Sequence, residues 1–334
     1  MRKISGQTWF LAVVVAGSCL LVGYLVLFYG PENGSQAAGP TSRLKLEDIP
    51  FDGQRAYDYL KKICQLGPRP SGSKAMDAQR QYLTTHFERL GAKVTRQEFR
   101  ANHPLDGSAV DMVNLIVQWH PDRKERILLG AHYDTRPYPD RDPTRPRGTF
   151  VGASDGASGV ALLMELGRKM PDLAGKYGVD FVLFDGEELV FSERGDYCLG
   201  SKLFAERYVA EPPPYRYRQG VVLDMIGDAD LQLYEEVNSM QWPETRAIVE
   251  AIWSTAKKLG VREFIPRPRH AVSDDHLPLC TIAKIPVCDV IDFDYTHWHT
   301  EGDTADKCSA LSLAKVGWVM HEWLKTAVVP PVVR

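Results

Sequence analysis

Two adjacent glutamates, Glu187 and Glu188, follow a short apolar run at residues 180–184. Aromatic and branched residues in a run of this length are typical of a buried strand. Acids at the carboxyl end of a strand lie where open α/β sheets place their chemistry. One such carboxylate can bind a metal ion while its neighbour moves protons. A glutamate pair alone more often begins a solvated helix, where the helix dipole favours negative charge, so the interpretation depends on the rest of the chain.

Seven more ionisable residues stand at the ends of expected strands or the starts of expected helices. They are His132 and Asp134 after residues 127–131, Asp224 after 221–223, His297 and His299 after 286–291, and Asp155 and Asp274 at helix starts. Alone, Asp155 and Asp274 could be helix N-caps, and His132 could be a hydrogen-bonded core histidine. Carboxylates and imidazoles gathered at one sheet edge are expensive to bury unless a metal ion or charged partners neutralise them. Oxygen and nitrogen donors with few thiolates favour a catalytic zinc site with an open position.

Strands and helices alternate along the part of the chain that must position these residues. Expected strands lie at residues 93–99, 112–119, 127–131, 180–184, 221–223 and 286–291. Expected helices lie at 55–66, 71–90, 160–170, 198–207, 245–259 and 309–326, with a short one beginning at 274. This alternation indicates an α/β fold, a three-layer sandwich whose mostly parallel central sheet is flanked by helices. Residues 211–217 are proline-rich and are expected to be a connector.

The N-terminal 30 residues have the character of a membrane anchor or signal segment. An uncharged stretch from residue 9 to 29 follows Arg2 and Lys3, and as a helix it would span about 30 Å, the thickness of a bilayer core. Basic residues before the stretch predict a cytoplasmic N-terminus and a catalytic domain on the extracytoplasmic side. A cleavable signal peptide is the alternative, and it would make the protein secreted. Residues 31–50 are expected to be a flexible linker, and residues 51–334 a single zinc-dependent catalytic domain.

The composition narrows the classes of partner and of metal site. The net charge is -3 and the sequence pI is about 6.3, which does not suggest a nucleic-acid-binding protein. The six cysteines include no Cys-x-x-Cys pair, so a thiolate metal site is disfavoured. Cys280 and Cys288 could pair in an oxidising compartment, although buried free thiols are the default expectation.

Five short blocks together resemble the zinc aminopeptidase superfamily, and they occur in that family's order. They are Ala131-His132-Tyr133-Asp134, Gly152-Ala153-Ser154-Asp155, Phe184-Asp185-Gly186-Glu187-Glu188, Leu223-Asp224-Met225-Ile226-Gly227 and Trp298-His299-Thr300. Within that superfamily, the block Asp274-Asp275-His276-Leu277-Pro278 and the tryptophan directly before His299 are more similar to the glutaminyl-peptide cyclotransferases. That branch converts an N-terminal glutamine to pyroglutamate and releases ammonia. The resemblance extends from about residue 55 to the C-terminus, and it implies a zinc exopeptidase-like fold.

The resemblance to the cyclotransferases also implies roles for individual residues. Asp155, Glu188 and His299 match the three ligands of a single zinc ion. Glu187 matches the acid/base, and Asp224 and Asp274 match acids of a hydrogen-bonded network beside it. Trp298 matches a wall of the substrate pocket, although ordinary core packing also explains a tryptophan there. The implied partners are peptide or protein N-termini.

The aminopeptidase branch implies a different use of the same positions. There, His132 and Asp224 would hold a second zinc ion, with Asp155 bridging the two. Glu187 would then deprotonate a water molecule for hydrolysis of the first peptide bond. Both ligand sets are intact in the sequence, so the number of ions stays open at this stage. A catalytically inactive binding module is a third hypothesis, which the intact set of ligands and acid/base disfavours.

The sequence departs from the animal cyclotransferases in two places. A tryptophan that they carry shortly after the paired glutamates has no counterpart, and residues 191–193 read Phe-Ser-Glu. Their disulfide beside the His132 block also has no equivalent. The first departure predicts a glutamine pocket of different shape.

Overall fold

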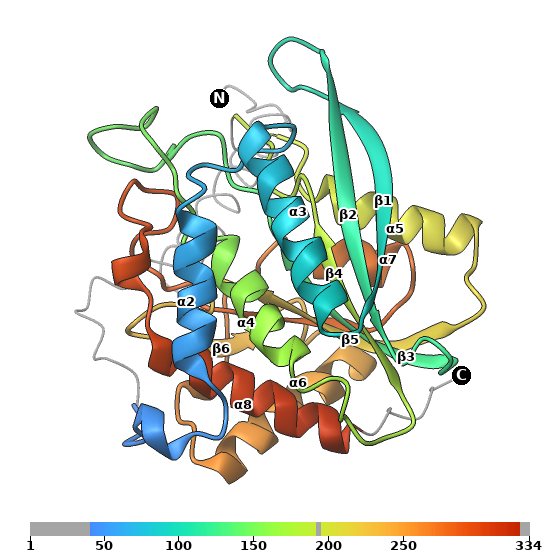
Figure 1. The fold of residues 1–334 in the computed structure, drawn as a ribbon. Coiled ribbons are helices and arrows are strands. Elements are labelled where there is room, and N and C mark those ends of the chain that lie inside the picture. Colours follow the sequence, from blue (N-terminus) through green and yellow to red (C-terminus); the bar gives the residue numbers. More distant parts are fainter. Residues whose placement is uncertain (1–40, 192–194, 328–334) are drawn as a thin grey trace, which may run out of the picture. The chain divides into compact units, whose positions relative to one another are not determined.

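A six-stranded sheet lies at the centre of the fold. A computed structural model describes residues 41–191 and 195–327 of the chain (Figure 1). The strand order is β1-β2-β4-β3-β5-β8. The strand bounds are β1 Lys93–Asn102, β2 Ala109–Trp119, β3 Glu125–His132, β4 Gly178–Phe184, β5 Arg216–Asp224 and β8 Val287–Ile291.

Four of these strands, β4, β3, β5 and β8, are mutually parallel, and they carry the residues of interest at their carboxyl ends. β2 pairs antiparallel with both β1 and β4. Only six residues join β1 to β2, and so short a connection makes an antiparallel hairpin because a parallel pair needs a longer crossover. The sheet is therefore mixed, and its parallel part consists of the strands whose carboxyl ends the sequence analysis singled out.

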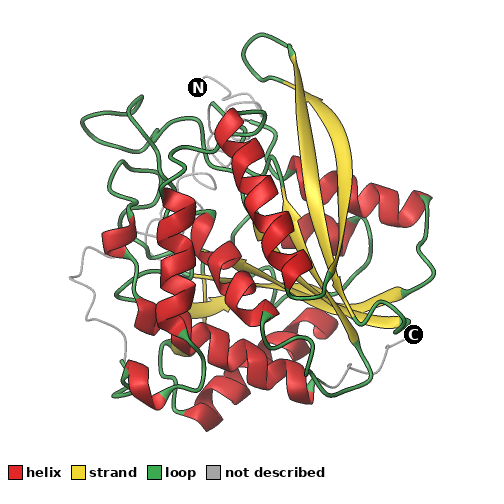
Figure 2. Ribbon diagram, in the orientation of Figure 1, coloured by secondary structure: helices red, strands yellow, loops and turns green. Residues whose placement is uncertain are grey.

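Helices cover both faces of the sheet, which confirms the predicted α/β sandwich (Figure 2). The larger core lies between one face and the helices α2 (Gly53–Cys64), α3 (Lys74–Arg89), α4 (Ala157–Gly167), α6 (Pro243–Leu259) and α8 (Ala310–Thr326). The smaller core lies on the other face, under α5 (Leu199–Ala210) and α7 (His276–Thr281). Neighbouring residues of β3 alternate between the two: Ile127 and Leu129 belong to the first core and Leu128 to the second, as the two-residue period of a strand requires.

The structure adds two short strands that the sequence analysis did not predict. β6 (Leu233–Glu236) and β7 (Phe264–Arg269) pair in parallel as a separate two-stranded sheet. β6 has only four residues, and β7 contains two prolines, which argue against a strand in a sequence pattern. The connector expected at residues 211–217 is also shorter than predicted, because β5 begins at Arg216. Two 3-10 helices, η1 (Leu46–Asp48) and η2 (Ala305–Lys307), complete the described elements.

The membrane segment expected at residues 9–29 lies outside the described residues. Among the helices described, none is both long enough and apolar enough to cross a bilayer. The last part of the expected linker contacts the domain: the N–H and hydroxyl of Ser42 donate hydrogen bonds to Glu263, and Ile49 is buried. The five cysteines of the described ranges, including Cys280 and Cys288, are free thiols.

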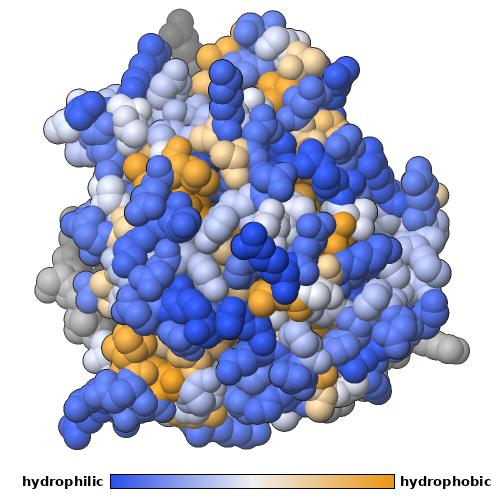
Figure 3. Space-filling model, viewed as in Figure 1, coloured by the Kyte–Doolittle hydropathy of each residue, from blue (hydrophilic) through white to orange (hydrophobic). Residues whose placement is uncertain are grey.

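Polar residues cover most of the face of the domain in Figure 3. The apolar residues of this face are scattered in small groups. Five large apolar side chains are exposed in the described ranges: Leu105, Tyr138, Val209, Trp242 and Ile282. Scattered apolar residues of this kind are usual on folded domains.

Candidate active site

The parallel strands deliver His132, Glu187, Glu188 and Asp224 to one edge of the sheet. His132 is the last residue of β3 and pairs with Phe184, the last residue of β4. The two glutamates follow β4 after a two-residue turn, and Asp224 ends β5. The sheet therefore brings together, at one edge, residues that lie far apart in the sequence, as the strand ends predicted.

Asp134 fixes the backbone of the paired glutamates. Its two carboxylate oxygens accept hydrogen bonds from the backbone N–H groups of Glu187 and Glu188, each at 3.1 Å. The turn before them needs Gly186, which has φ +73°, and a Cβ there would lie 2.7 Å from the sulfur of Met112. A positive φ and this close approach both favour glycine, so the local sequence Asp-Gly-Glu-Glu follows from the geometry of the turn.

A first ligand cluster consists of Asp155, Glu188 and His299. The Nε2 atom of His299 lies 2.8 Å from Oε1 of Glu188 and 3.5 Å from Oδ2 of Asp155. All three side chains are buried, and one ligand atom from each lies within 4.8 Å of the others. Oδ2 of Asp155 is buried and accepts no hydrogen bond from the described residues. Imidazole nitrogens and carboxylate oxygens both bind zinc, and catalytic zinc sites have three protein ligands and an open position, so these residues fit a zinc ion.

A second cluster consists of His132, Asp155 and Asp224. The Nε2 atom of His132 lies 3.2 Å from Oδ1 of Asp155 and 3.1 Å from Oδ1 of Asp224. Burial opposes protonation of His132, but its contacts with Asp134, Asp155 and Asp224 raise its pKa well above the ordinary value. Asp155 thus belongs to both clusters and turns one oxygen toward each imidazole.

The position of Asp155 is set by the residues on either side of it. The carboxylate of Asp303 accepts hydrogen bonds from the N–H groups of Ser154 (2.8 Å) and Asp155 (3.1 Å). Gly156, at φ +90°, is the N-cap of α4, and a Cβ on it would lie 2.5 Å from the carbonyl oxygen of Asp134. Asp155 therefore does not cap α4, and the N-cap interpretation is wrong for it. Asp274 does not cap α7 either, because the N-cap position of that helix is Asp275.

Charged neighbours hold the ligands His299 and Glu188 in place. The Nδ1 atom of His299 lies 3.6 Å from Asp140, which forms a two-pronged ion pair with Arg136. Arg136 is buried and also contacts Glu188, through its backbone N–H at 3.1 Å and its guanidinium at 3.4 Å. Burial opposes ionisation of Glu188, but His299 and Arg136 lower its pKa to about 2. Glu188 is therefore ionised at neutral pH, as a metal ligand must be.

Glu187 is buried beside these clusters in an acidic environment. Burial raises its pKa well above the ordinary value; His132 opposes this rise, and Glu188 and Asp274 reinforce it. The thiol of Cys198, at the start of α5, donates a hydrogen bond of 3.4 Å to Oε1 of Glu187. A carboxylate oxygen of Glu187 lies within 4.8 Å of ligand atoms of His132 and Glu188, and Glu187 also forms a group of this kind with Cys198 and Asp274. A buried carboxyl group with a raised pKa is suited to acid/base chemistry.

Behind Asp274 lies a group of buried polar residues to which the sequence analysis assigned no role. Asp275, His276 and Asp289 have no exposed surface. Nδ1 of His276 lies 3.8 Å from Asp289, and burial followed by repulsion from Asp224 raises the pKa of Asp274 to about 6. Asp289 was hidden within an apolar strand, β8, and a lone aspartate in such a strand is the signal that could have found it.

A cavity of about 230 Å³ opens onto the two clusters. Its lining includes Glu187, Asp224, Asp274 and His299. Trp298 is half-buried in its wall, with ring centroids 4.2 Å from His299 and 4.6 Å from Phe293. The remaining candidate, His297, does not line the cavity and belongs to none of the ligand clusters found in the described part of the chain.

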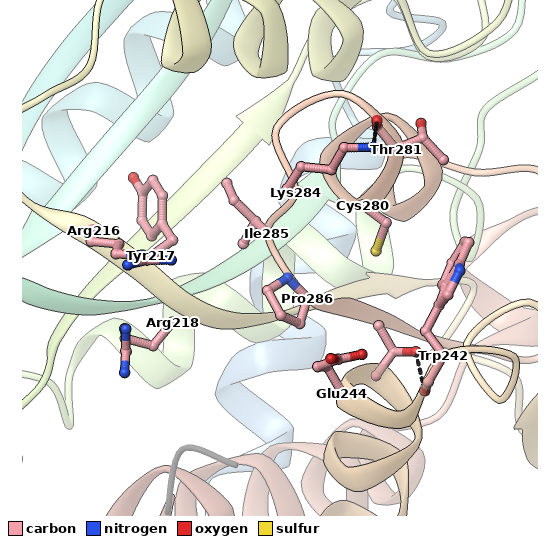
Figure 4. A pocket seen from close by; sticks show the side chains of 11 residues that line it. Arg216, Tyr217, Arg218, Trp242, Glu244, Cys280, Thr281, Lys284, Ile285 and Pro286 are labelled. Carbon is pink, nitrogen blue, oxygen red and sulfur yellow. Dashed lines mark hydrogen bonds between the residues drawn. The ribbon is translucent and has the colours of Figure 1, made fainter. Parts of the chain in front are cut away.

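A larger cavity, of about 380 Å³, lies at the opposite end of β5 (Figure 4). Arg216 and Arg218 line it from the amino end of that strand, Cys280 from α7, and Trp242 from the start of α6. None of the ligand clusters of the described residues lies there. The smaller cavity is therefore the candidate active site, because the residues of the first ligand cluster line it.

Comparisons with known proteins agree with this site. The family model of peptidase family M28 matches residues 114–324. The crystal structure of Fimbriiglobus ruber glutaminyl cyclase is 38% identical and superposes with a TM-score of 0.80, covering 88% of this chain and 100% of that one. A Zn-dependent exopeptidase from Parabacteroides distasonis is 32% identical with a TM-score of 0.77, covering 83% and 99%. The glutaminyl-peptide cyclotransferase of Drosophila melanogaster is 26% identical over 261 residues, 71% of each chain.

Proposed function

We infer that this chain, which belongs to peptidase family M28, is a zinc-dependent glutaminyl-peptide cyclotransferase. It converts the N-terminal glutamine of a peptide to pyroglutamate and releases ammonia. The observation that carries this function is the buried Glu187, which lies in a cavity directly beside a three-residue zinc ligand set. Similarity to bacterial glutaminyl cyclases over most of both chains favours cyclisation as the reaction at this site.

In this proposal Asp155, Glu188 and His299 hold the zinc ion. Bound there, zinc supplies Lewis-acid polarisation of the carbonyl group of the glutamine side chain. Arg136 keeps Glu188 ionised, and Asp303 holds the backbone at Asp155. These neighbours orient the ligands before any substrate arrives, which is the role of outer partners in metal sites.

Glu187 carries the proton. The α-amino nitrogen attacks the side-chain amide carbon of the same glutamine, forming a C–N bond, and Glu187 takes a proton from that nitrogen. As the bond to the amide nitrogen breaks, Glu187 returns the proton and ammonia leaves. The elevated pKa of Glu187 suits a group that must both accept and donate near neutral pH.

Asp224, Asp274 and Trp298 shape the cavity around this transfer. We propose that the two aspartates attract the α-amino group toward Glu187, because they place further negative charge in the cavity lining. Trp298 packs against the apolar part of the glutamine side chain and excludes water from it. Exclusion of water matters because a cyclase must favour the intramolecular amine over hydrolysis.

An aminopeptidase with two zinc ions is the alternative function. The specific observation in its favour is the cluster of His132, Asp155 and Asp224, which shares Asp155 with the first. In that reaction Glu187 would take a proton from water. The two functions leave different products from the same peptide.

Incubation of zinc-loaded protein with a glutamine-initiated peptide distinguishes the functions. We expect one molecule of ammonia per peptide, measured by a coupled ammonia assay. We also expect a product that is lighter than the substrate by the mass of ammonia alone, measured by mass spectrometry. Release of free glutamine would instead identify the aminopeptidase, and the absence of any turnover would contradict both. A peptide with an N-terminal asparagine in place of glutamine is the matched control.

We propose further that residues 1–30 tether the domain to a membrane, with the domain on the extracytoplasmic side. The support is the length and composition of residues 9–29 and the basic residues that precede them. Expression of the full chain should yield activity in the membrane fraction, whereas a variant without residues 1–30 should yield the same activity in the supernatant. Full-length protein found only in the supernatant at its full mass would contradict the tether.

A further inference from the structure

The cavity beside Glu187 is lined by buried acids and also by an exposed guanidinium group, that of Arg141. Among the acids, Glu187 and Asp274 are 8% and 4% exposed. A peptide with its α-amino group at the buried Glu187 extends from there toward solvent, where Arg141 is an exposed cation of the lining.

Arg141 is held in place by contacts on both its backbone and its side chain. Its backbone N–H donates a 3.1 Å hydrogen bond to the carbonyl oxygen of His299. Its guanidinium carbon lies 3.9 Å from the ring centroid of Trp298, as a cation–π stack. The next residue, Asp142, accepts a 3.0 Å hydrogen bond from the N–H of Glu301. Stacking uses the face of the guanidinium and leaves the N–H groups on its edge for a ligand.

Two other arginines of the loop at residues 136–148 are already paired. Arg136 binds Asp140 at 2.7 Å, and Arg145 lies 3.1 Å from Glu301. Arg141 makes no ion pair with any carboxylate in the ranges that the structure describes. Its positive charge is therefore available to a bound peptide.

We propose that Arg141 makes the enzyme selective for peptides with acidic side chains in the two residues after the N-terminal glutamine. The proposal deepens the cyclotransferase function and depends on it. A carboxylate at these positions can accept two parallel N–H bonds from the edge of the guanidinium. A lysine there would instead face a like charge, which disfavours binding. Stacking on Trp298 reduces the side-chain freedom that Arg141 would lose on binding.

The test compares kcat/KM for three tripeptide amides, Gln-Glu-Glu, Gln-Ala-Ala and Gln-Lys-Lys, at low ionic strength. The C-terminal amide removes the terminal carboxylate, so only the side chains differ in charge. We expect each step in this order to lower kcat/KM by about two- to fivefold, which corresponds to the free energy of one exposed ion pair. The differences should lie in KM, because Arg141 does not touch the reacting atoms, and added salt should reduce them.

Substitutions of Arg141 separate its charge from its packing. Arg141→Gln should make the three peptides nearly equal, and Arg141→Glu should reverse their order. Arg141→Lys keeps the charge without the planar stack and should keep the wild-type order. Arg145→Gln is the matched control, since Arg145 is in the same loop but does not line the cavity, and it should also keep that order.

Two results would overturn the proposal. One is a wild-type order that survives in Arg141→Glu, and the other is an Arg145→Gln variant that loses the order as completely as Arg141→Gln. If wild-type enzyme releases ammonia from none of the three peptides, the cyclotransferase function itself is contradicted, and the selectivity falls with it.

Discussion

Replacement of Glu187 by glutamine is expected to remove nearly all turnover while zinc binding is retained. The substitution keeps the size of the side chain and an oxygen that can accept from Cys198, but it removes the group that carries the proton. Acid/base catalysis by a side chain contributes about 10² to 10⁴ in rate, so we expect kcat for ammonia release to fall by about that factor. The measurement is the initial rate of ammonia release together with the zinc content of the purified variant.

The matched control is Glu188→Gln, one residue along the same turn. Glu188 contacts His299 at 2.8 Å within the first cluster, so this variant should lose zinc as well as activity. The pair therefore separates a proton carrier from a ligand with two nearly identical changes. Loss of zinc from Glu187→Gln, or full retention of zinc by Glu188→Gln, would reverse the roles that we assign to them.

His299→Ala is expected to weaken zinc binding far more than His297→Ala. His299 supplies the only imidazole of the first cluster, and its Nε2 atom faces both carboxylates. Loss of an outer partner of a metal site typically costs 10 to 100-fold in affinity, and we expect loss of the ligand itself to cost more than about 100-fold. The measurement is a competition titration with a chromogenic zinc chelator.

His297 is a suitable control because it lies two residues away on the same loop. The centroid of its ring lies 5.6 Å from that of Tyr295, and its Nδ1 atom would lie 2.7 Å from a Cβ at Gly302. His297→Ala should therefore bind zinc with nearly wild-type affinity. If both variants lost zinc equally, the choice of His299 as the ligand would be wrong, and so would the first cluster.

The positions of the central strands and their terminal residues could be predicted because local patterns encode them. Apolar runs end directly before His132 and Asp224, and a third is separated from Glu187 by two residues. Parallel strands then carry these residues to the same edge, without any knowledge of which strands are neighbours. The assignment of Asp155 and His299, which lie on loops, came from the family resemblance and not from such a pattern.

Contacts that join distant segments could not be predicted from the sequence. The hydrogen bond from Cys198 to Glu187 depends on where α5 begins, and the ion pairs of Arg136 depend on the path of its loop. Asp289 looked like part of an apolar strand, because the strand pattern does not reveal that His276 lies 3.8 Å from it. The strand pair β6–β7 was missed because its prolines locally argue against a strand.

The two oxygens of Asp155 have a consequence for how this family diversifies. Since one oxygen faces His299 and the other faces His132, the same carboxylate would serve the proposed one-ion transferase and equally the alternative two-ion hydrolase. An evolutionary change from one chemistry to the other would then need no new scaffold. Selection could act on the few side chains on the His132 side of this carboxylate while the strands, turns and acid/base stay as they are.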